Sequence, residues 1–149
     1  MRVFQEIAGA GPDGLITVLE GLPVDDADRL EEALAAFKLE HGYRTHDVVE
    51  IHPETPNDAL AKFDPPHTHA EDEVRLFLEG SGIFDIRADD GTWYRFLLGK
   101  GDMIVVPKGR VHRFEPTYHK SLRCVRVFQD QAGWTPDYVE DSKFASPNA

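Results

Sequence analysis

Residues 67–80 read HTHAEDEVRLFLEG, with two histidines one residue apart, then three acids and an apolar run. Side chains along an extended strand point to opposite faces in turn, so residues of equal parity share a face. The odd-numbered positions here combine imidazole, carboxylate, guanidinium and aromatic groups: His67, His69, Glu73, Arg75 and Phe77. The stretch therefore predicts a strand with one face that carries metal-ligating side chains.

Short β-like runs separated by turn residues surround this stretch. They read DVVEI, EVRLFLEG, GIFDIRA, TWYRFLL, DMIVVP, VHRFEP and LRCVRVFQ. Glycine or proline stands between most of them, at residues 80–82, 90–91, 99–101 and 107–109. Asp-Gly at 90–91 is the strongest hairpin signal. Many short strands at even spacing are typical of a sandwich or barrel, so we expect an all-β-dominated fold with breaks at these places.

One helix is expected before the strands, in PVDDADRLEEALAAFKLEHGYR. Asp25 or Asp26 is the N-cap candidate, acids follow in the first turn, and Gly42 is a C-terminal stop. Apolar residues recur at helical spacing: Leu30, Ala33, Leu34 and Phe37. We expect this helix to cover part of the outside of the barrel.

The composition restricts the partners. A formal charge of −11 and a pI near 4.9 disfavour nucleic acid and anionic membranes, which are bound by clustered Lys and Arg. Any anion site must therefore be made locally, by a metal or by buried arginines. No apolar run approaches the roughly 20 residues of a membrane span, and no signal peptide is evident, so a cytoplasmic protein is expected. Cys124 is the only cysteine, and its expected role is packing.

A second strand, VHRFEP, offers a third imidazole, His112, after the turn-forming KGDMIVVPKGR. Three imidazoles and one carboxylate suit iron, nickel, manganese or zinc. In an octahedral arrangement, four protein ligands leave two adjacent positions open for substrate or oxygen. The predicted ligand set is His67, His69, Glu73 and His112. The other four histidines are expected to be ordinary surface residues: His41, His46, His52 and His119.

Two neighbouring acids compete with Glu73 for the ligand role. Asp72 has the wrong parity, and Glu71 follows His69 so closely that the chain would have to bend for both to reach one ion. We favour a solvated acidic turn for both. The alternative is a carboxylate that orients a ligand histidine.

The motifs HTHAEDEVRLFLEGSGIFDIR and KGDMIVVPKGRVHRF resemble the cupin superfamily, with its H-x-H, Glu and Gly followed by G-D-x-x-x-x-P-x-G-x-x-H. Together with EHGYRTHDVVEIHPETPN and VRVFQDQAGWTPDY, they look like the acireductone dioxygenases of methionine salvage. The likeness runs from about residue 40 to about residue 138. It implies one cupin domain over 1–149, a double-stranded β-helix or jelly-roll barrel: a helix-containing segment (1–47), the barrel (48–129) and a C-terminal extension (130–149).

The resemblance implies that His67, His69, Glu73 and His112 ligate one Fe(II) or Ni(II) ion per chain. It also implies that four side chains handle the substrate: Arg75, Phe114, Arg126 and Trp134. Parity places Arg75 with the ligands and Phe114 with His112. Arg126 lies on an apolar strand, where a buried guanidinium needs an anionic partner such as an enediolate. The alternatives are salt bridges for the two arginines and plain packing for the two aromatic residues.

The implied reaction is cleavage of 1,2-dihydroxy-3-keto-5-methylthiopentene by O2. The iron form would yield 4-methylthio-2-oxobutanoate and formate, and the nickel form carbon monoxide, formate and 3-methylthiopropanoate. Arg75 is the expected catalytic cation, and Asp72 and Glu71 are weak candidates for the base. The competing hypotheses are another metal-dependent cupin enzyme (a dioxygenase or an isomerase) and a non-catalytic small-molecule-binding cupin. The chain is expected to be a monomer or a homodimer.

Overall fold

The structure is a computed structural model that describes residues 4–6, 15–55, 65–117, 121–129 and 136–139. Its described part holds one helix and ten strands, which confirms the expected strand-dominated fold. The elements in chain order are β1 (Phe4–Glu6), β2 (Thr17–Leu19), α1 (Ala27–His41), β3 (Thr45–Ile51), β4 (His67–Thr68), β5 (Glu73–Arg87), β6 (Trp93–Gly99), β7 (Met103–Val106), β8 (His112–Pro116), β9 (Leu122–Phe128) and β10 (Asp137–Tyr138). Among these residues no helix is long and apolar enough to cross a bilayer.

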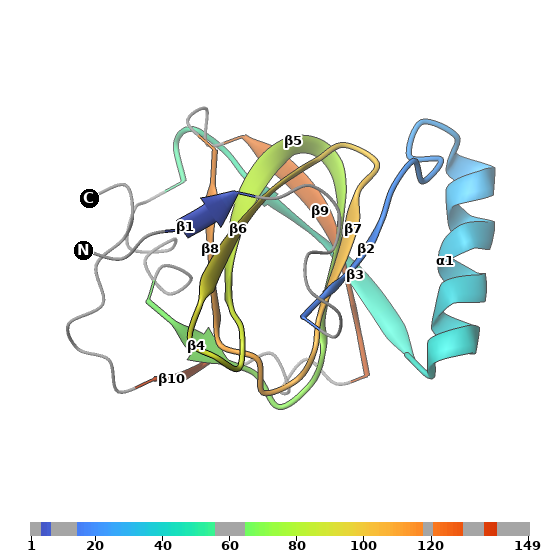
Figure 1. The fold of residues 1–149 in the computed structure, drawn as a ribbon. Helices are drawn as coiled ribbons and strands as arrows, with labels where there is room; N and C mark the ends of the chain where they lie inside the picture. Colours follow the sequence, from blue (N-terminus) through green and yellow to red (C-terminus); the bar gives the residue numbers. More distant parts are fainter. Residues whose placement is uncertain (1–3, 7–14, 56–64, 118–120, 130–135, 140–149) are drawn as a thin grey trace.

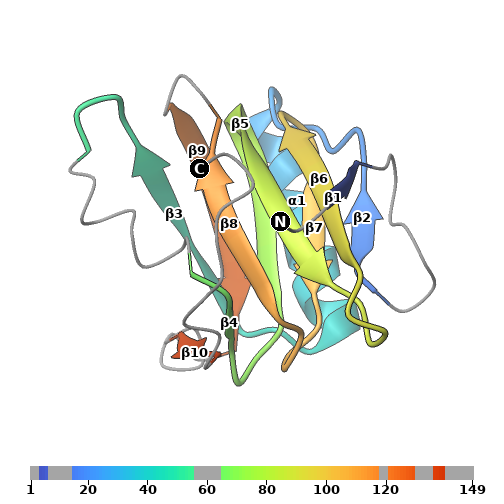
Figure 2. The same ribbon diagram turned by 60° about the vertical axis from the view of Figure 1, so that its left-hand side comes forward.

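The strands curl into a barrel, with α1 outside it (Figure 1). The first half of β5 pairs antiparallel with β7 and β9, and its second half pairs with β6 and β8. β3 extends the β9 side, while β4 and β10 extend the β8 side (Figure 2). The long strand β5 therefore joins the two sheets. The single strand expected over HTHAEDEVRLFLEG is wrong, because the chain bends at residues 70–71 and divides the stretch between β4 and β5.

The expected break at residues 80–82 is wrong, because β5 runs unbroken through them. A register shift between Phe77 and Glu79 bends the strand instead, and Gly80 has a φ of 74°. A Cβ at Gly80 would collide with the backbone carbonyl of Ser121, and one at Gly82 would lie 2.5 Å from the Phe114 ring. The glycines thus permit a sharp bend and close packing inside a strand. The Asp90-Gly91 turn between β5 and β6 is confirmed.

The expected helix is confirmed, and its ends are set as the sequence indicates. Asp26 caps the N-terminus by accepting a hydrogen bond from the Arg29 amide at 3.2 Å. Gly42 ends the helix in the left-handed conformation, with a φ of 78°. Leu34 and Phe37 pack on the outer face of the barrel with a cluster of strand residues: Val74, Leu76, Leu78, Met103, Val125 and Val127.

A second apolar cluster fills the inside of the barrel. It includes Phe77, Phe84, Ile86, Phe96, Ile104, Phe114 and Cys124, from five different strands. Cys124 is fully buried there, as its expected packing role requires. Burial is the main cause that raises the pKa of its thiol to about 11.

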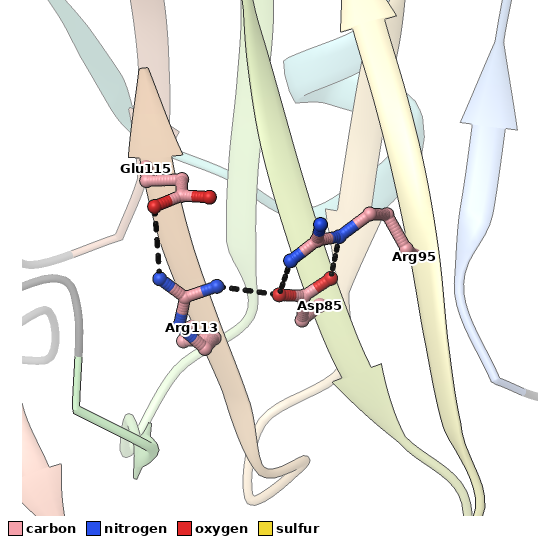
Figure 3. A network of polar contacts seen from close by, with 4 residues as sticks. All are labelled: Asp85, Arg95, Arg113 and Glu115. Carbon is pink, nitrogen blue, oxygen red and sulfur yellow. Dashed lines mark hydrogen bonds and ion pairs between the residues drawn. The ribbon is translucent and has the colours of Figure 1, made fainter. Parts of the chain in front are cut away.

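A buried ion-pair network crosses three neighbouring strands, and the sequence analysis did not predict it (Figure 3). Asp85 on β5 accepts two hydrogen bonds from Arg95 on β6, each at 2.8 Å, and one from Arg113 on β8. Arg113 also donates to Glu115 at 3.1 Å. The side chains of Asp85 and Arg113 are fully buried, so their charges are stabilised by each other and by these neighbours rather than by water.

Candidate metal centre

The four predicted ligand side chains converge at one end of the barrel. His67 comes from β4, His69 follows it, Glu73 begins β5 and His112 begins β8. All four are buried. One ligand nitrogen from each histidine lies within 4.8 Å of the others.

Glu73 completes the group from the first residue of β5. One of its oxygens lies 3.2 Å from His69 Nε2, and the other lies 3.7 Å from His112 Nε2. Ligand atoms about 2.1 Å from one ion and at right angles lie about 3 Å apart, so these separations suit a shared ion.

Backbone carbonyls fix which nitrogen of two imidazoles faces the centre. His67 Nδ1 donates to the Pro65 carbonyl at 2.8 Å, and His112 Nδ1 donates to the Arg110 carbonyl at 2.9 Å. A carbonyl oxygen can only accept, so Nδ1 carries the proton and Nε2 keeps its lone pair. This is the tautomer that metal-binding histidines require, oriented by the usual outer partner.

The protonation states also suit a cation. Burial, and then the nearby His112, lower the pKa of His67 to about 4, so its imidazole is neutral at physiological pH. Burial alone would raise the pKa of Glu73. The neighbouring His112, His69 and Arg75 instead hold the pKa of Glu73 well below its usual range. Buried Glu73 Oε2 and His112 Nε2 make no hydrogen bond to any described residue, which fits atoms directed at an ion.

The turn at residues 107–110 holds this centre together. The Gly109 amide donates to the His69 carbonyl at 3.1 Å, and the Lys108 amide donates to Asp72 Oδ1 at 2.9 Å. The Arg110 carbonyl orients His112, as described above. One turn thus fixes two ligand histidines and the loop before Glu73.

The sequence model of the ARD/ARD' family matches residues 7–136. The chain belongs to this family. It is 39% identical over 140 residues to the acireductone dioxygenase of Leptospira biflexa, covering 89% of this chain and 78% of that protein. It is 40% identical over 127 residues to the acireductone dioxygenase of Xenopus laevis, covering 79% and 71%. The acireductone dioxygenase of Bacillus anthracis, solved with a cadmium ion in its active centre, superposes with a TM-score of 0.75 at 28% identity over 83% of each chain.

Membership of the ARD/ARD' family agrees with the expected cupin barrel, and the group of three histidines identifies a metal centre. Arg75 lies next to it, as parity predicts. Its guanidinium is buried, 3.9 Å from Glu73 Oε1 and 4.9 Å from the centre of the Phe114 ring. Phe114 is buried as well and packs against Phe84. A cation and an aromatic wall therefore border the carboxylate side of the centre.

Arg126 has an ionic partner within the chain. Its Nε donates to Asp47 Oδ1 at 2.8 Å and its Nη2 donates to the other oxygen. Arg75, Arg126 and Asp47 are paired in register across β5, β9 and β3, so they share one face. Unlike Arg75, the Arg126 and Asp47 side chains are 26% and 29% exposed. The sequence analysis expected a buried guanidinium that pairs with the substrate and gave a salt bridge as the alternative. The structure shows a salt bridge, to Asp47.

The two competing acids anchor loops. Asp72 accepts from the Tyr43 hydroxyl at 2.8 Å as well as from Lys108, and Glu71 accepts from the Gln129 amide at 2.9 Å. The three-histidine group includes none of the three acids, and Glu73 is the one whose oxygens lie 3.2 Å from His69 Nε2 and 3.7 Å from His112 Nε2. Tyr43 lies just before the first β-like run and Asp47 begins it. Their partners Asp72 and Arg126 are 29 and 79 residues further along the chain, so the sequence gives no local sign of either contact. Trp134 and His119 lie outside the described residues, whereas His41, His46 and His52 are exposed.

Proposed function

We propose that this chain is a metal-dependent dioxygenase that cleaves acireductone, 1,2-dihydroxy-3-keto-5-methylthiopentene, with O2. The observation that carries the proposal is a buried group of three histidines and one glutamate in a chain of the ARD/ARD' family. With iron, the products are 4-methylthio-2-oxobutanoate and formate. With nickel, they are carbon monoxide, formate and 3-methylthiopropanoate.

We assign one Fe(II) or Ni(II) ion to His67, His69, Glu73 and His112. A bound ion of this kind would supply the positive charge that attracts the oxygens of an enediolate. The chain contributes three imidazole side chains and an ionised carboxylate, held by the contacts described above. Which of the two metals is used in the cell depends on availability as well as on ligand type.

Arg75 is placed to stabilise the negative charge of the substrate. Its guanidinium is buried beside Glu73, in surroundings where a charge interaction is stronger than in water. Phe114 gives an apolar surface for the methylthioalkyl tail. Arg126 is assigned to the exposed side of the site, where it stays paired with Asp47. The substrate role of Trp134 stays a prediction.

Both oxygens of Asp72 accept hydrogen bonds that anchor the loop. Its role as a base stays a prediction. The same holds for the single domain over 1–149, the monomeric or homodimeric state and the cytoplasmic location. Nucleic acid and membranes are not proposed as partners of so acidic a chain.

The test of the reaction is anaerobic reconstitution with Fe(II), followed by acireductone and air. We expect metal-dependent loss of substrate with stoichiometric formate, faster than in a metal-free control. The Ni(II)-loaded protein is expected to release carbon monoxide as well. Substrate loss no faster than in the control would exclude the dioxygenase and leave a metal-binding cupin with another ligand.

Replacing Arg75 by methionine tests the substrate contact. We expect kcat/KM for acireductone to fall about 10- to 100-fold, because a charge-assisted contact is lost while an apolar side chain of similar length remains. The matched control is Arg123→Met, an exposed arginine of β9 that pairs with Glu50 and should leave kcat/KM unchanged. Unchanged kcat/KM in Arg75→Met, with metal content intact, would favour a different cupin enzyme.

A further inference from the structure

A cleft lies beside the metal centre and is separate from it. Its volume is about 400 Å³, and it is bordered by residues 87–89 at the end of β5 and by residues 107–111 between β7 and β8. None of the four metal-centre side chains lines it, and neither do Arg75 and Phe114. The cleft therefore has no part in the proposed reaction.

The cleft is locally basic in an acidic chain. Its lining carries three cations, Arg87, Lys108 and Arg110, and one acid, Asp89, a local balance of three minus one, or +2. The chain as a whole has a charge of −11. Such a local excess of positive charge, within a concave surface, concentrates anions from solution.

Two of these cations have no ionic partner within the part of the chain that the structure describes. Arg110 pairs with Asp89 at 2.7 Å. The side chains of Arg87 and Lys108 make no hydrogen bond or ion pair with any residue in the described ranges. One anion with two negative charges would neutralise both.

The backbone under these cations is already fixed. The Gly109 and Lys108 amides are bonded to His69 and Asp72, and the Arg110 amide donates to the Pro107 carbonyl at 3.1 Å. Recognition in the cleft must therefore come from side chains, and the loop that presents Lys108 and Arg110 need not be reorganised when an anion binds. A preformed site loses less entropy on binding.

We propose that this cleft binds a phosphate group, either inorganic phosphate or the phosphate of a small monoester. A phosphate carries close to two negative charges at neutral pH and has several acceptor oxygens for a guanidinium and an ammonium group. A monocarboxylate would neutralise only one of the two cations. The site goes beyond the proposed dioxygenase function, because neither the enediol nor its metal occupies it.

The test is equilibrium dialysis of the metal-loaded protein against radiolabelled inorganic phosphate, with the ionic strength held constant by chloride. We expect saturable binding of one phosphate per chain. Arg87→Gln and Lys108→Gln should each weaken it about tenfold, the effect of losing one charge-assisted contact. Lys100→Gln is the matched control: this lysine lies in the β6–β7 turn and pairs with Asp25, so its loss should change nothing. Competition with glycerol 3-phosphate identifies the source, since displacement at lower concentration than phosphate indicates a monoester site.

Phosphate is also a ligand for metals, so the metal centre must be separated from the cleft. In His112→Ala that circular dichroism shows to be folded, phosphate binding is expected to persist, whereas its loss would place the phosphate on the metal and overturn the proposal. Absence of saturable binding, or equal binding by wild type, Arg87→Gln and Lys108→Gln, would overturn it as well. The experiment measures phosphate binding and not turnover. Its result is therefore independent of whether the chain catalyses the proposed reaction.

Discussion

His112→Ala is expected to lower the affinity for the metal at least about 100-fold and to abolish metal-dependent turnover, because outer-shell changes alone cost 10- to 100-fold. The substitution removes a buried Nε2 that faces Glu73 and an Nδ1 whose position is fixed by the Arg110 carbonyl. The measurement is competition for Ni(II) against a chelator of known affinity, followed by Fe(II)-dependent loss of acireductone.

The matched control is His52→Ala, since His52 is an exposed histidine that pairs only with exposed Glu50 among the ion pairs described. It should keep wild-type metal affinity. Circular dichroism and an unfolding transition separate two causes of lost activity. A folded but metal-poor His112→Ala indicates a catalytic ion, whereas global unfolding indicates a structural one. Wild-type metal affinity in the folded variant would remove His112 from the ligand set.

The metal-centre side chains could be predicted from the sequence because their signal is local. His67, His69 and Glu73 lie within seven residues, which keeps them close in space. The single strand expected for them was wrong, because the chain bends at residues 70–71, so that His67 lies in β4 and Glu73 begins β5. The helix could be predicted equally well, since Asp26 and Gly42 are cap residues at its two ends. Both features depend on residues close in sequence, where backbone geometry decides the outcome.

Features that depend on strand pairing could not be predicted. Arg126 and Asp47 are 79 residues apart, and they become neighbours only because β3 pairs with β9 in one register. The break expected at residues 80–82 was wrong for a related reason. Glycine is typical of turns, but at Gly80 the close approach of the Ser121 carbonyl, just before β9, is what excludes a side chain. Sequence spacing does not distinguish these two uses of glycine.

The turn at residues 107–110 combines both kinds of information. Its glycine and proline mark it as a turn in the sequence, but its role depends on what it touches. One side bonds to His69, Asp72 and His112, and the other borders the basic cleft. A single short segment therefore supports the proposed metal site and the proposed phosphate site, and mutations of its backbone would affect both.

Asp85→Asn is expected to destabilise the fold by about 3–5 kcal/mol, the cost of leaving a buried charge without its partner. Arg113 is fully buried, and the substitution removes the Asp85 carboxylate from beside it, while its pair with Glu115 remains. The measurement is the free energy of unfolding from urea titration. The control is Asp25→Asn, which breaks a pair between an 80% exposed aspartate and a 52% exposed lysine and should have little effect.

A second variant shows whether the network adds stability or only satisfies charges that are already buried. Replacing Asp85 by leucine and Arg113 by methionine removes both fully buried charges at once, while Arg95 and Glu115 are partly exposed and can reach water. Buried ion pairs replaced by apolar residues are often neutral in stability, so the double variant is expected to be more stable than Asp85→Asn alone. The alternative result is a free energy of unfolding of Asp85→Asn within about 1 kcal/mol of the wild-type value, which is the size of a weak surface pair. Arg113 would then have to be solvated or to pair with another residue. The network would then not hold β5, β6 and β8 together.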